Sequence, residues 1–312
     1  MIKKFNYKKY IVYISFIIVF TVFSIVLKDK GFSSPANLMN ILRQTSMISV
    51  AAIGMCFAIS AGLIDLSIGG VISITALLVA LLLKYSISVP VAVTAGLGMG
   101  ALCGAINGGI VAKVRIPSFL VTLGTSTIFA GASRIMTNLE AVPITNKVFN
   151  NVFGSGNIGP ISSLFIWTLI MMTIGHIVYK KTSFGKAVLS VGGNESAARY
   201  SGINVDKTKF WTMVICSISA SFAGIMYAAR MHGARYTLGE NDVMSVIAAV
   251  VIGGTSFSGG KGTIVGTIIG SIVIGILNNG LLLMGLSVSE QMIARGVVII
   301  IAVSLSLRES RD

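Results

Sequence analysis

Charged residues are scarce in this chain, and their scarcity sets its class. Only 11% of its 312 residues are Asp, Glu, Lys or Arg, while 54% are hydrophobic and the mean hydropathy is +0.89. A soluble domain of this size carries roughly a quarter charged residues. Because the deficit extends along the whole chain, in apolar runs of about 17 residues or more, it indicates membrane-spanning helices. A soluble fold is thereby excluded, and we expect an all-α polytopic membrane protein.

Cysteine and histidine are also rare, which argues against a metal centre. The three cysteines, Cys56, Cys103 and Cys216, all fall in apolar segments without metal-ligand spacing, and the chain has two histidines. We interpret the cysteines as small core residues. A membrane enzyme would need clustered His, Cys or carboxylates at a membrane face. The sequence has no such cluster, so it predicts neither a metal site nor a catalytic residue.

Acidic residues are outnumbered by basic ones, 10 to 24, for a net charge of +14. Such an excess is typical of nucleic-acid binding, but membrane proteins also concentrate Lys and Arg in their cytoplasmic loops. The second explanation fits the composition better. We therefore expect membrane lipid, and no nucleic acid, around this chain.

Charged and turn residues divide the chain into about ten spans within one transmembrane domain covering residues 1–312. The basic start "MIKKFNYKKY" precedes an apolar stretch without a small-x-small cleavage site, which predicts an uncleaved first span with its N-terminus inside. Most of the 24 Lys and Arg then lie on the cytoplasmic side, as does the C-terminus. The spans are expected near 11–27, 45–60, 68–83, 90–111, 118–136, 162–179, 211–229, 244–257, 263–283 and 291–307.

Two long apolar runs are each interrupted once. Asp65 is the only charge between Arg43 and Lys84, within "SAGLIDLSIGG", and Lys261 is the only charge in the run 243–289. Paired interruptions in two halves of a transporter indicate a central passage region and a possible internal repeat. Span 244–257 would reach only about 21 Å of a ~30 Å core, which predicts a half-span or re-entrant segment.

Asp65 itself has two interpretations. It marks a tight turn on the inner side, where it or Ser67 caps the next helix, or it takes a direct part in the transport path.

The segment "SGGKGT" around Lys261 is not a phosphate loop, because Gly262 stands where that motif requires Ser or Thr.

Glycines recur at a spacing of four in two spans and form strips without side chains. We expect these strips to allow close helix packing; lining a narrow path is the alternative. The residues are Gly96, Gly100, Gly104 and Gly108 in the first strip, and Gly262, Gly266 and Gly270 in the second.

The largest inner loop, residues 180–210, contains a short predicted helix in "NESAARYSG". Asn194 is a good N-cap, Glu195 favours the positive end of the helix, and Gly202 ends it. A short helix held between two spans suits docking into a groove of another protein, whereas a solvated connector is the plainer alternative.

The segment "NESAARYSGI" resembles the coupling helix of permease subunits of ABC importers. Three further stretches, "SAGLIDLSIGGVISITA", "IPSFLVTLGTSTIFAG" and "IAAVVIGGTSFSGGKGTIVGTIIG", are similar to the ribose/simple-sugar permeases of bacteria. The resemblance extends from about residue 45 to residue 306. Ala61 and Leu63 depart from the family, which commonly has a Gly-Gly-Ile-Asp run at this point.

The resemblance implies a bacterial inner-membrane importer in which two permease copies, identical or different, form the pathway. An ABC ATP-binding subunit would bind ATP and Mg²⁺, so this chain needs no cofactor, and a periplasmic or lipid-anchored sugar-binding protein would deliver the cargo. Contact with the ATPase would fall on Gly193, Asn194, Glu195, Ala197, Ala198 and Gly202.

Neutral sugars require hydroxyl and amide partners. Candidate path residues are therefore Asp65, Ser67, Asn107, Thr122, Thr125, Asn278 and Asn279, each with local backbone bonding or packing as the alternative role. Relatives of this class carry ribose, other sugars, autoinducer-2, nucleosides or riboflavin, and the sequence does not choose among them. A secondary transporter would need ionisable residues within spans, for which only Asp65 and Arg295 qualify.

Overall fold

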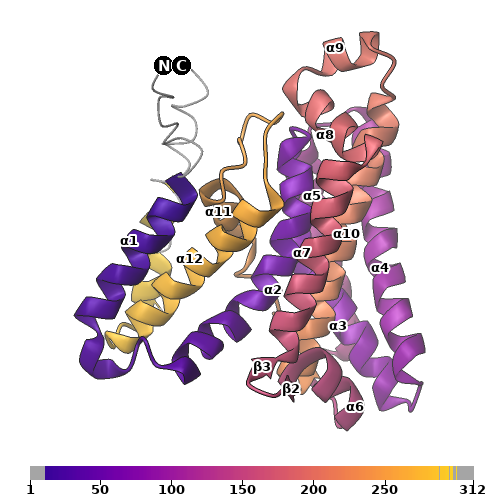
Figure 1. Ribbon diagram of the computed structural model, residues 1–312. Helices are drawn as coiled ribbons and strands as arrows, with labels where there is room; N and C mark the ends of the chain where they lie inside the picture. The colour runs from indigo at the N-terminus through magenta and orange to yellow at the C-terminus, as the bar shows by residue number, and fades with distance from the viewer. Residues whose placement is uncertain (1–10, 288, 295, 298–299, 301–312) are drawn as a thin grey trace, which may run out of the picture.

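The computed structural model describes residues 11–287, 289–294, 296–297 and 300, which are almost entirely helical (Figure 1). Six of the described helices are long and apolar enough to cross a membrane, and three apolar helices are shorter. The chain is therefore an all-α polytopic membrane protein. The helices are α1 (Ile11–Val26), α2 (Pro35–Ser60), α3 (Ile68–Lys84), α4 (Val89–Gly109), α5 (Ser118–Thr137), α6 (Lys147–Asn150), α7 (Ser163–Lys181), α8 (Ser183–Gly193), α9 (Glu195–Tyr200), α10 (Val205–Arg230), α11 (Val243–Ile252) and α12 (Ile264–Leu283).

Short turns and strand pairs complete the described elements. A 3-10 turn, η2 (Lys28–Lys30), follows α1, and two π-helical turns, η3 (Ile110–Val114) and η4 (Asn151–Ser155), follow α4 and α6. Two antiparallel pairs of two-residue strands join β1 (Val142–Pro143) to β4 (Gly233–Ala234) and β2 (Asn157–Ile158) to β3 (Ile161–Ser162), with Val142 opposite Ala234 and Asn157 opposite Ser162.

Two helices of 26 residues each, α2 and α10, form the centre of the molecule. They cross closely because Gly54 of α2 has no side chain: a Cβ there would lie 2.8 Å from the Cα of Cys216 in α10. In a membrane, such close backbone approach supplies the packing contacts that hold helices together. The other helices surround this pair.

The first glycine strip faces α10 along most of α4. A Cβ at Gly100 would lie 2.3 Å from Ser221 Cβ, and one at Gly104 would lie 2.6 Å from Val214 Cα. Gly108 meets Phe210 in the same way, while Gly96 meets Val79 of α3. The strip is thus occupied by neighbouring helices in this structure.

The second glycine strip is not continuous on one helix. Gly266 and Gly270 belong to α12; Gly270 faces the backbone of α11 at Ala249, and Gly266 faces Gly253, the residue that follows α11. Gly262 precedes α12 and faces other parts of the chain, which corrects the expected three-residue strip. The turn at Gly260 delays the start of the helix to Ile264, after Thr263, whose hydroxyl caps it.

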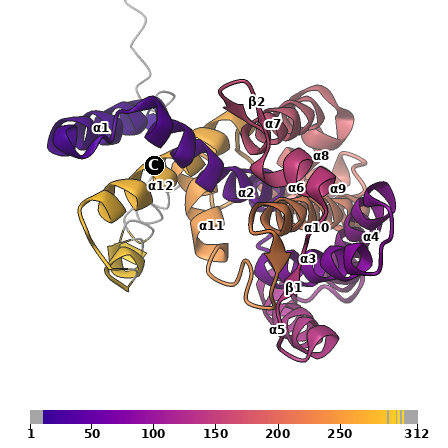
Figure 2. The same cartoon turned by 90° about the horizontal axis from the view of Figure 1, so that it is seen from below.

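A second, smaller apolar cluster joins α1 to α12. Phe23 of α1 packs on Gly280 of α12, and Phe32 is fully buried beside them. Seen from below, α1, α11 and α12 lie on one side of the molecule, and α4, α5 and α10 lie on the other (Figure 2). The long helix α2 connects the two groups.

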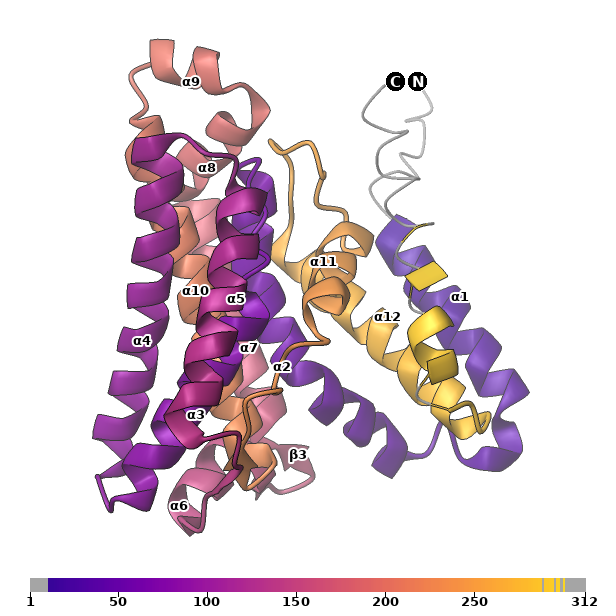
Figure 3. The ribbon, with the colours of Figure 1, turned by 180° about the vertical axis from the view of Figure 1, so that it is seen from behind.

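Each of the two central helices is followed by an irregular segment that leads into a shorter helix, and the segment between α10 and α11 can be followed in Figure 3. Residues 61–67 lead from α2 into α3, and residues 231–242 lead from α10 into α11. A Cβ at Gly69, in the first turn of α3, would lie 2.8 Å from the carbonyl oxygen of Gly239 in the second segment.

Helix α11 is too short to cross a bilayer core. With 10 residues it reaches only about 15 Å, as its short apolar run predicted.

Several expected boundaries were wrong. Helix α2 begins at Pro35, ten residues before the expected span, because Ser34 caps it and proline suits the first helical position. Helix α10 begins at Val205, inside the expected loop, because the Asn204 side chain caps it. Most of the expected span 291–307, including Arg295, lies outside the described residues.

Candidate functional site

Helix α9 is present as predicted, with both ends closed by local hydrogen bonds. The Asn194 side chain accepts a bond of 2.9 Å from the amide of Ala197. At the other end, Gly202 has a φ of +80°, and the amides of Gly202 and Ile203 donate to the carbonyls of Arg199 and Ala198. This arrangement satisfies the last carbonyls of the helix. A six-residue helix therefore has a defined start and end.

Ion pairs and a small apolar cluster hold α9 in place. Lys209 of α10 contacts Glu195 at 2.7 Å, and Arg199 contacts Asp206 at 3.2 Å. The hydrogen bond from Lys209 holds the pKa of Glu195 below its ordinary value of 4.5. Ala198 is buried with Val191 of α8 and Val205 of α10. These contacts join α8, α9 and the start of α10.

The outer face of α9 is left open. Tyr200 is 93% exposed, and Ala197 is exposed, although the adjacent Ala198 is buried. Figure 1 shows that α9 lies beyond the ends of the long helices, and we call this side the α9 end. An exposed aromatic ring beside small residues suits insertion into a groove of another protein.

Ser60, the last residue of α2, lies where several segments meet at the α9 end. Its carbonyl accepts a bond of 2.9 Å from the amide of Gly260, and its hydroxyl bonds to the Tyr179 hydroxyl at 2.7 Å. Gly192 of α8 approaches the same carbonyl. We call Ser60, Tyr179, Gly192, Gly260 and Gly262 the Ser60 junction.

Asp65 is fully buried and accepts hydrogen bonds from the residue two positions further on. Its Oδ1 accepts from the Ser67 amide at 2.8 Å and from the Ser67 hydroxyl at 2.5 Å. The Asn107 amide group of α4 donates to Ser67 Oγ at 2.8 Å. Asp65 therefore closes the turn before α3, whereas the Ser67 side chain makes no cap bond to that helix.

The segment that carries Asp65 is fastened to the start of α5. The amide of Ile64 donates to Ser118 Oγ and the amide of Leu66 donates to Thr122 Oγ1, each at 2.9 Å. The hydroxyl of Thr122 also contacts the carbonyl of Ile64 at 3.2 Å. Side chains of α5 thus replace the backbone partners that this irregular segment lacks.

The structure brings some of the candidate path residues together and separates others. Asp65, Ser67, Asn107 and Thr122 form one buried cluster, and Thr125 follows on α5 with its hydroxyl 3.4 Å from the Thr122 carbonyl. Asn279 lies elsewhere, on α12, and exchanges two side-chain hydrogen bonds with Asn37. Asn278 is its neighbour on α12.

Sequence reasoning missed several residues around these sites. Cys216 and Ser217 of α10 lie beside the Asp65 carboxyl, and Ser118 holds its segment. Each stands in a helix far away in the sequence, where an isolated serine or cysteine gives no signal. Lys209 was recognisable as a basic residue within reach of Glu195, but its pairing depends on the angle between α9 and α10.

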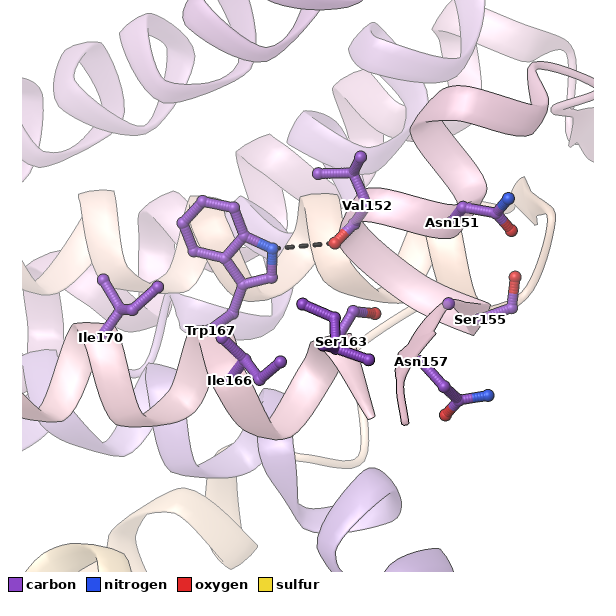
Figure 4. A pocket seen from close by; sticks show the side chains of 10 residues that line it. Asn151, Val152, Ser155, Asn157, Ser163, Ile166, Trp167 and Ile170 are labelled. Atoms are coloured by element: carbon purple, nitrogen blue, oxygen red, sulfur yellow. Dashed lines mark hydrogen bonds between the residues drawn. The ribbon is translucent and has the colours of Figure 1, made fainter. Parts of the chain in front are cut away.

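The end opposite α9 carries a surface hollow of about 620 Å³ between η4 and α7 (Figure 4). The Trp167 indole donates a bond of 2.9 Å to the Val152 carbonyl at one wall. Polar side chains of Asn151, Ser155 and Asn157 line one part, while Ile166 and Ile170 line the other. This amphipathic lining is that expected at a membrane boundary.

Comparison with known proteins points to a transport family. A family profile described as the permease component of branched-chain amino acid transport systems matches residues 37–303. The ribose import permease protein RbsC of Escherichia coli strain K12 is 39% identical over 281 residues, which make up 88% of this chain and 87% of that protein.

More distant relatives are similar over most of their length. RbsC of Bacillus subtilis strain 168 is 37% identical over 285 residues, or 90% of this chain and 88% of that protein. The L-arabinose ABC transporter permease protein AraH of Azospirillum brasilense is 31% identical over 292 residues, or 92% of this chain and 84% of that protein. No solved structure matches the chain.

Proposed function

This chain belongs to the permease-component family that matches residues 37–303, which makes it the membrane permease subunit of an ABC importer, and we propose that its cargo is a monosaccharide. Ribose is the first candidate, because the relatives at 39% and 37% identity are ribose import permeases. L-Arabinose, another pentose, is the named cargo of a relative at 31%. The chain is a transport subunit rather than an enzyme.

The observation that carries the proposed mechanism is the geometry of α9. A capped helix, fixed by Glu195–Lys209 and Arg199–Asp206, presents Tyr200 beyond the membrane helices. We infer that α9 docks into a groove of the ATP-binding subunit, which binds ATP and Mg²⁺ in place of this chain. The segment Gly193 to Gly202 would form that contact.

The α9 end would face the cytoplasm of a bacterial cell, with both termini on that side of the inner membrane. The charge distribution supports this orientation, because exposed basic side chains gather around α8, α9 and η3. They are Lys113, Arg115, Lys180, Lys181, Lys186, Arg199 and Lys207.

The opposite face would receive the sugar-binding protein, lipid-anchored or periplasmic, on the loop between α5 and α7. This loop exposes Asn151 and Asn157 and carries α6, η4 and the β2–β3 pair. A second permease copy, identical or homologous, would complete the pathway.

Transport would proceed by alternating access, driven by ATP binding and hydrolysis in the partner. The meeting point of Gly69 and Gly239 lies between two helices, α3 and α11, that start inside the molecule. Thr125 and Asn278 would supply hydroxyl and amide groups to a neutral sugar, because the Thr125 hydroxyl makes only a long bond of 3.4 Å to the Thr122 carbonyl and the Asn278 side-chain oxygen has no partner among the described residues. Asp65, Ser67, Asn107, Thr122 and Asn279 would act by positioning these helices, since their side chains already bond within the chain.

The docking role of α9 is tested by replacing its exposed aromatic ring. Tyr200→Ala should weaken binding of the purified ATPase to the permease in nanodiscs by about 2 kcal/mol, or about thirtyfold. Tyr85→Ala is the matched control, because Tyr85 is 73% exposed at the opposite end. Equal affinity of the wild type and Tyr200→Ala would contradict docking through this ring.

The cargo is tested with the complete importer in proteoliposomes. Binding protein loaded with ribose should stimulate ATP hydrolysis more than protein loaded with xylose, galactose or arabinose. Stimulation by none of the sugars would contradict the monosaccharide assignment and favour autoinducer-2, a nucleoside or riboflavin. Import driven by an ion gradient without ATPase would instead indicate a secondary transporter.

A further inference from the structure

Gly192, near the end of α8, makes close backbone contacts that the docking of α9 does not require. It is the penultimate residue of α8, two positions before the N-cap of α9. A Cβ at Gly192 would lie 1.9 Å from the carbonyl oxygen of Ser60 and 2.8 Å from the amide nitrogen of Gly260. Three backbone segments therefore touch at this point, which only glycine permits.

Ser60 connects these segments through both its backbone and its side chain. The Gly260 amide donates to its carbonyl at 2.9 Å, and its hydroxyl bonds to Tyr179 at 2.7 Å. Gly262 covers both hydroxyl groups, since a Cβ there would lie 2.4 Å from either oxygen. The chain leaves Ser60 directly into residues 61–67 and the Asp65 turn.

The loop that supplies Gly260 is closed by its own hydrogen bonds. The Ser256 amide donates to the Lys261 carbonyl, and the Gly259 amide donates to the Ser256 carbonyl, each at 3.0 Å. Gly259 and Gly260 have φ values of +81° and +72°, which favour glycine. The loop continues into α12, whose first turn is capped by Thr263.

We propose that the Ser60 junction is a mechanical relay, in which the end of α8, the end of α2 and the loop 256–262 move as one unit when the ATPase moves α9. This inference rests on the proposed docking of an ATPase on α9. Backbone atoms already in contact resist compression, so a displacement of α8 passes to Ser60 and Gly260. From these residues it reaches α3, which follows α2 through residues 61–67, and α12, which packs against α2.

Gly192→Ala and Gly109→Ala form a matched pair that tests the relay. Gly109 ends α4, outside the docking segment, and a Cβ there would meet nothing within 4 Å. In the complete importer, both variants should retain the ATPase. Gly192→Ala should lower import and the stimulation of ATP hydrolysis by loaded binding protein at least about tenfold, and Gly109→Ala should change them less than about twofold. Unchanged import by Gly192→Ala would overturn the relay.

Cross-linking provides a second test that does not depend on the folding of Gly192→Ala. Ser190 and Lys261 are exposed, Ser190 stands two residues before Gly192, and Lys261 follows Gly260, so Ser190→Cys and Lys261→Cys can be joined by a bis-maleimide. The native cysteines are buried. If the junction moves as one unit, the cross-linked importer should keep its import rate within about twofold. Loss of import in the doubly substituted protein, with none in either single variant, would overturn the relay.

The two proposals fail in different ways. A wild-type chain that retains no ATPase contradicts the docking role of α9, and the relay falls with it. Retained ATPase with normal import by Gly192→Ala, or import lost on cross-linking, contradicts the relay alone.

Discussion

Lys209 of α10 holds Glu195 of α9 in a salt bridge of 2.7 Å, and Arg199 of α9 holds Asp206 of α10 at 3.2 Å. Helix α9 supplies the negative charge of the first pair and the positive charge of the second, and α10 supplies the opposite charge of each. All the carboxylates involved are nearly half exposed, so neither pair adds much to global stability. Their effect is to keep α9 from rotating about its own axis, which fixes the direction in which Tyr200 points.

Reversing one of these charges should release α9. Glu195→Lys places a third cation beside Arg199 and Lys209, so we expect the ATPase recovered with the purified permease to fall at least about tenfold. Insertion into the membrane should be unchanged. Ser190→Lys is the control, because it adds a charge at an exposed residue of α8, outside the docking segment, without breaking either pair. Full recovery of the ATPase with Glu195→Lys would show that this residue plays no part in coupling.

The ion pair between Glu195 and Lys209, which fixes α9, should also weaken in acid. The pKa of Glu195 is lowered by Lys209, so its stabilising effect is complete above the ordinary value of 4.5 and is lost as the pH falls through the lower value of the folded protein. A spin label at Ser201→Cys should become more mobile below this pH. In Glu195→Gln the label should already be mobile at pH 7 and change less on acidification. Identical profiles for the two proteins would contradict this account.

Asp65 should be replaceable by Asn but not by Ala. Asn keeps an oxygen that accepts from the Ser67 amide and hydroxyl, so Asp65→Asn should import sugar within about twofold of the wild type. Asp65→Ala removes both bonds and should lower the free energy of unfolding in detergent by about 1 kcal/mol. An inactive Asp65→Asn variant with unchanged thermal stability would mean that the charge itself takes part in transport.

The packing of α4 on α10 should be sensitive to one added methyl group. Gly104→Ala would bring a Cβ to 2.6 Å from Val214 Cα, and we expect it to destabilise the protein by about 1–3 kcal/mol. Gly98→Ala meets nothing within 4 Å and should be neutral or stabilising, since alanine favours helix. Thermal unfolding in detergent compares the two. Equal midpoints would indicate that the helices separate easily at Gly104.

Local sequence patterns were sufficient to predict much of α9 and the class of fold. Asn194 and Gly202 bond within one turn, so their bonds depend on the sequence around them and were predicted from it. The long apolar runs likewise determined that the chain spans a membrane, because bilayer thickness sets the length of a spanning helix. The turn at Asp65 is also local, as its carboxylate bonds to Ser67.

Other features depend on where separate helices meet, which no short pattern encodes. Ser118 and Thr122 hold the Asp65 segment from α5, and Asn279 of α12 pairs with Asn37 of α2. The sequence predicted no role for Gly192 or Gly260, which the fold places against Ser60. The sequence by itself therefore determined the membrane class, the α9 helix and its caps. Tertiary structure alone decided the junctions, because close approach of backbones depends on the positions of helices that are distant in the chain.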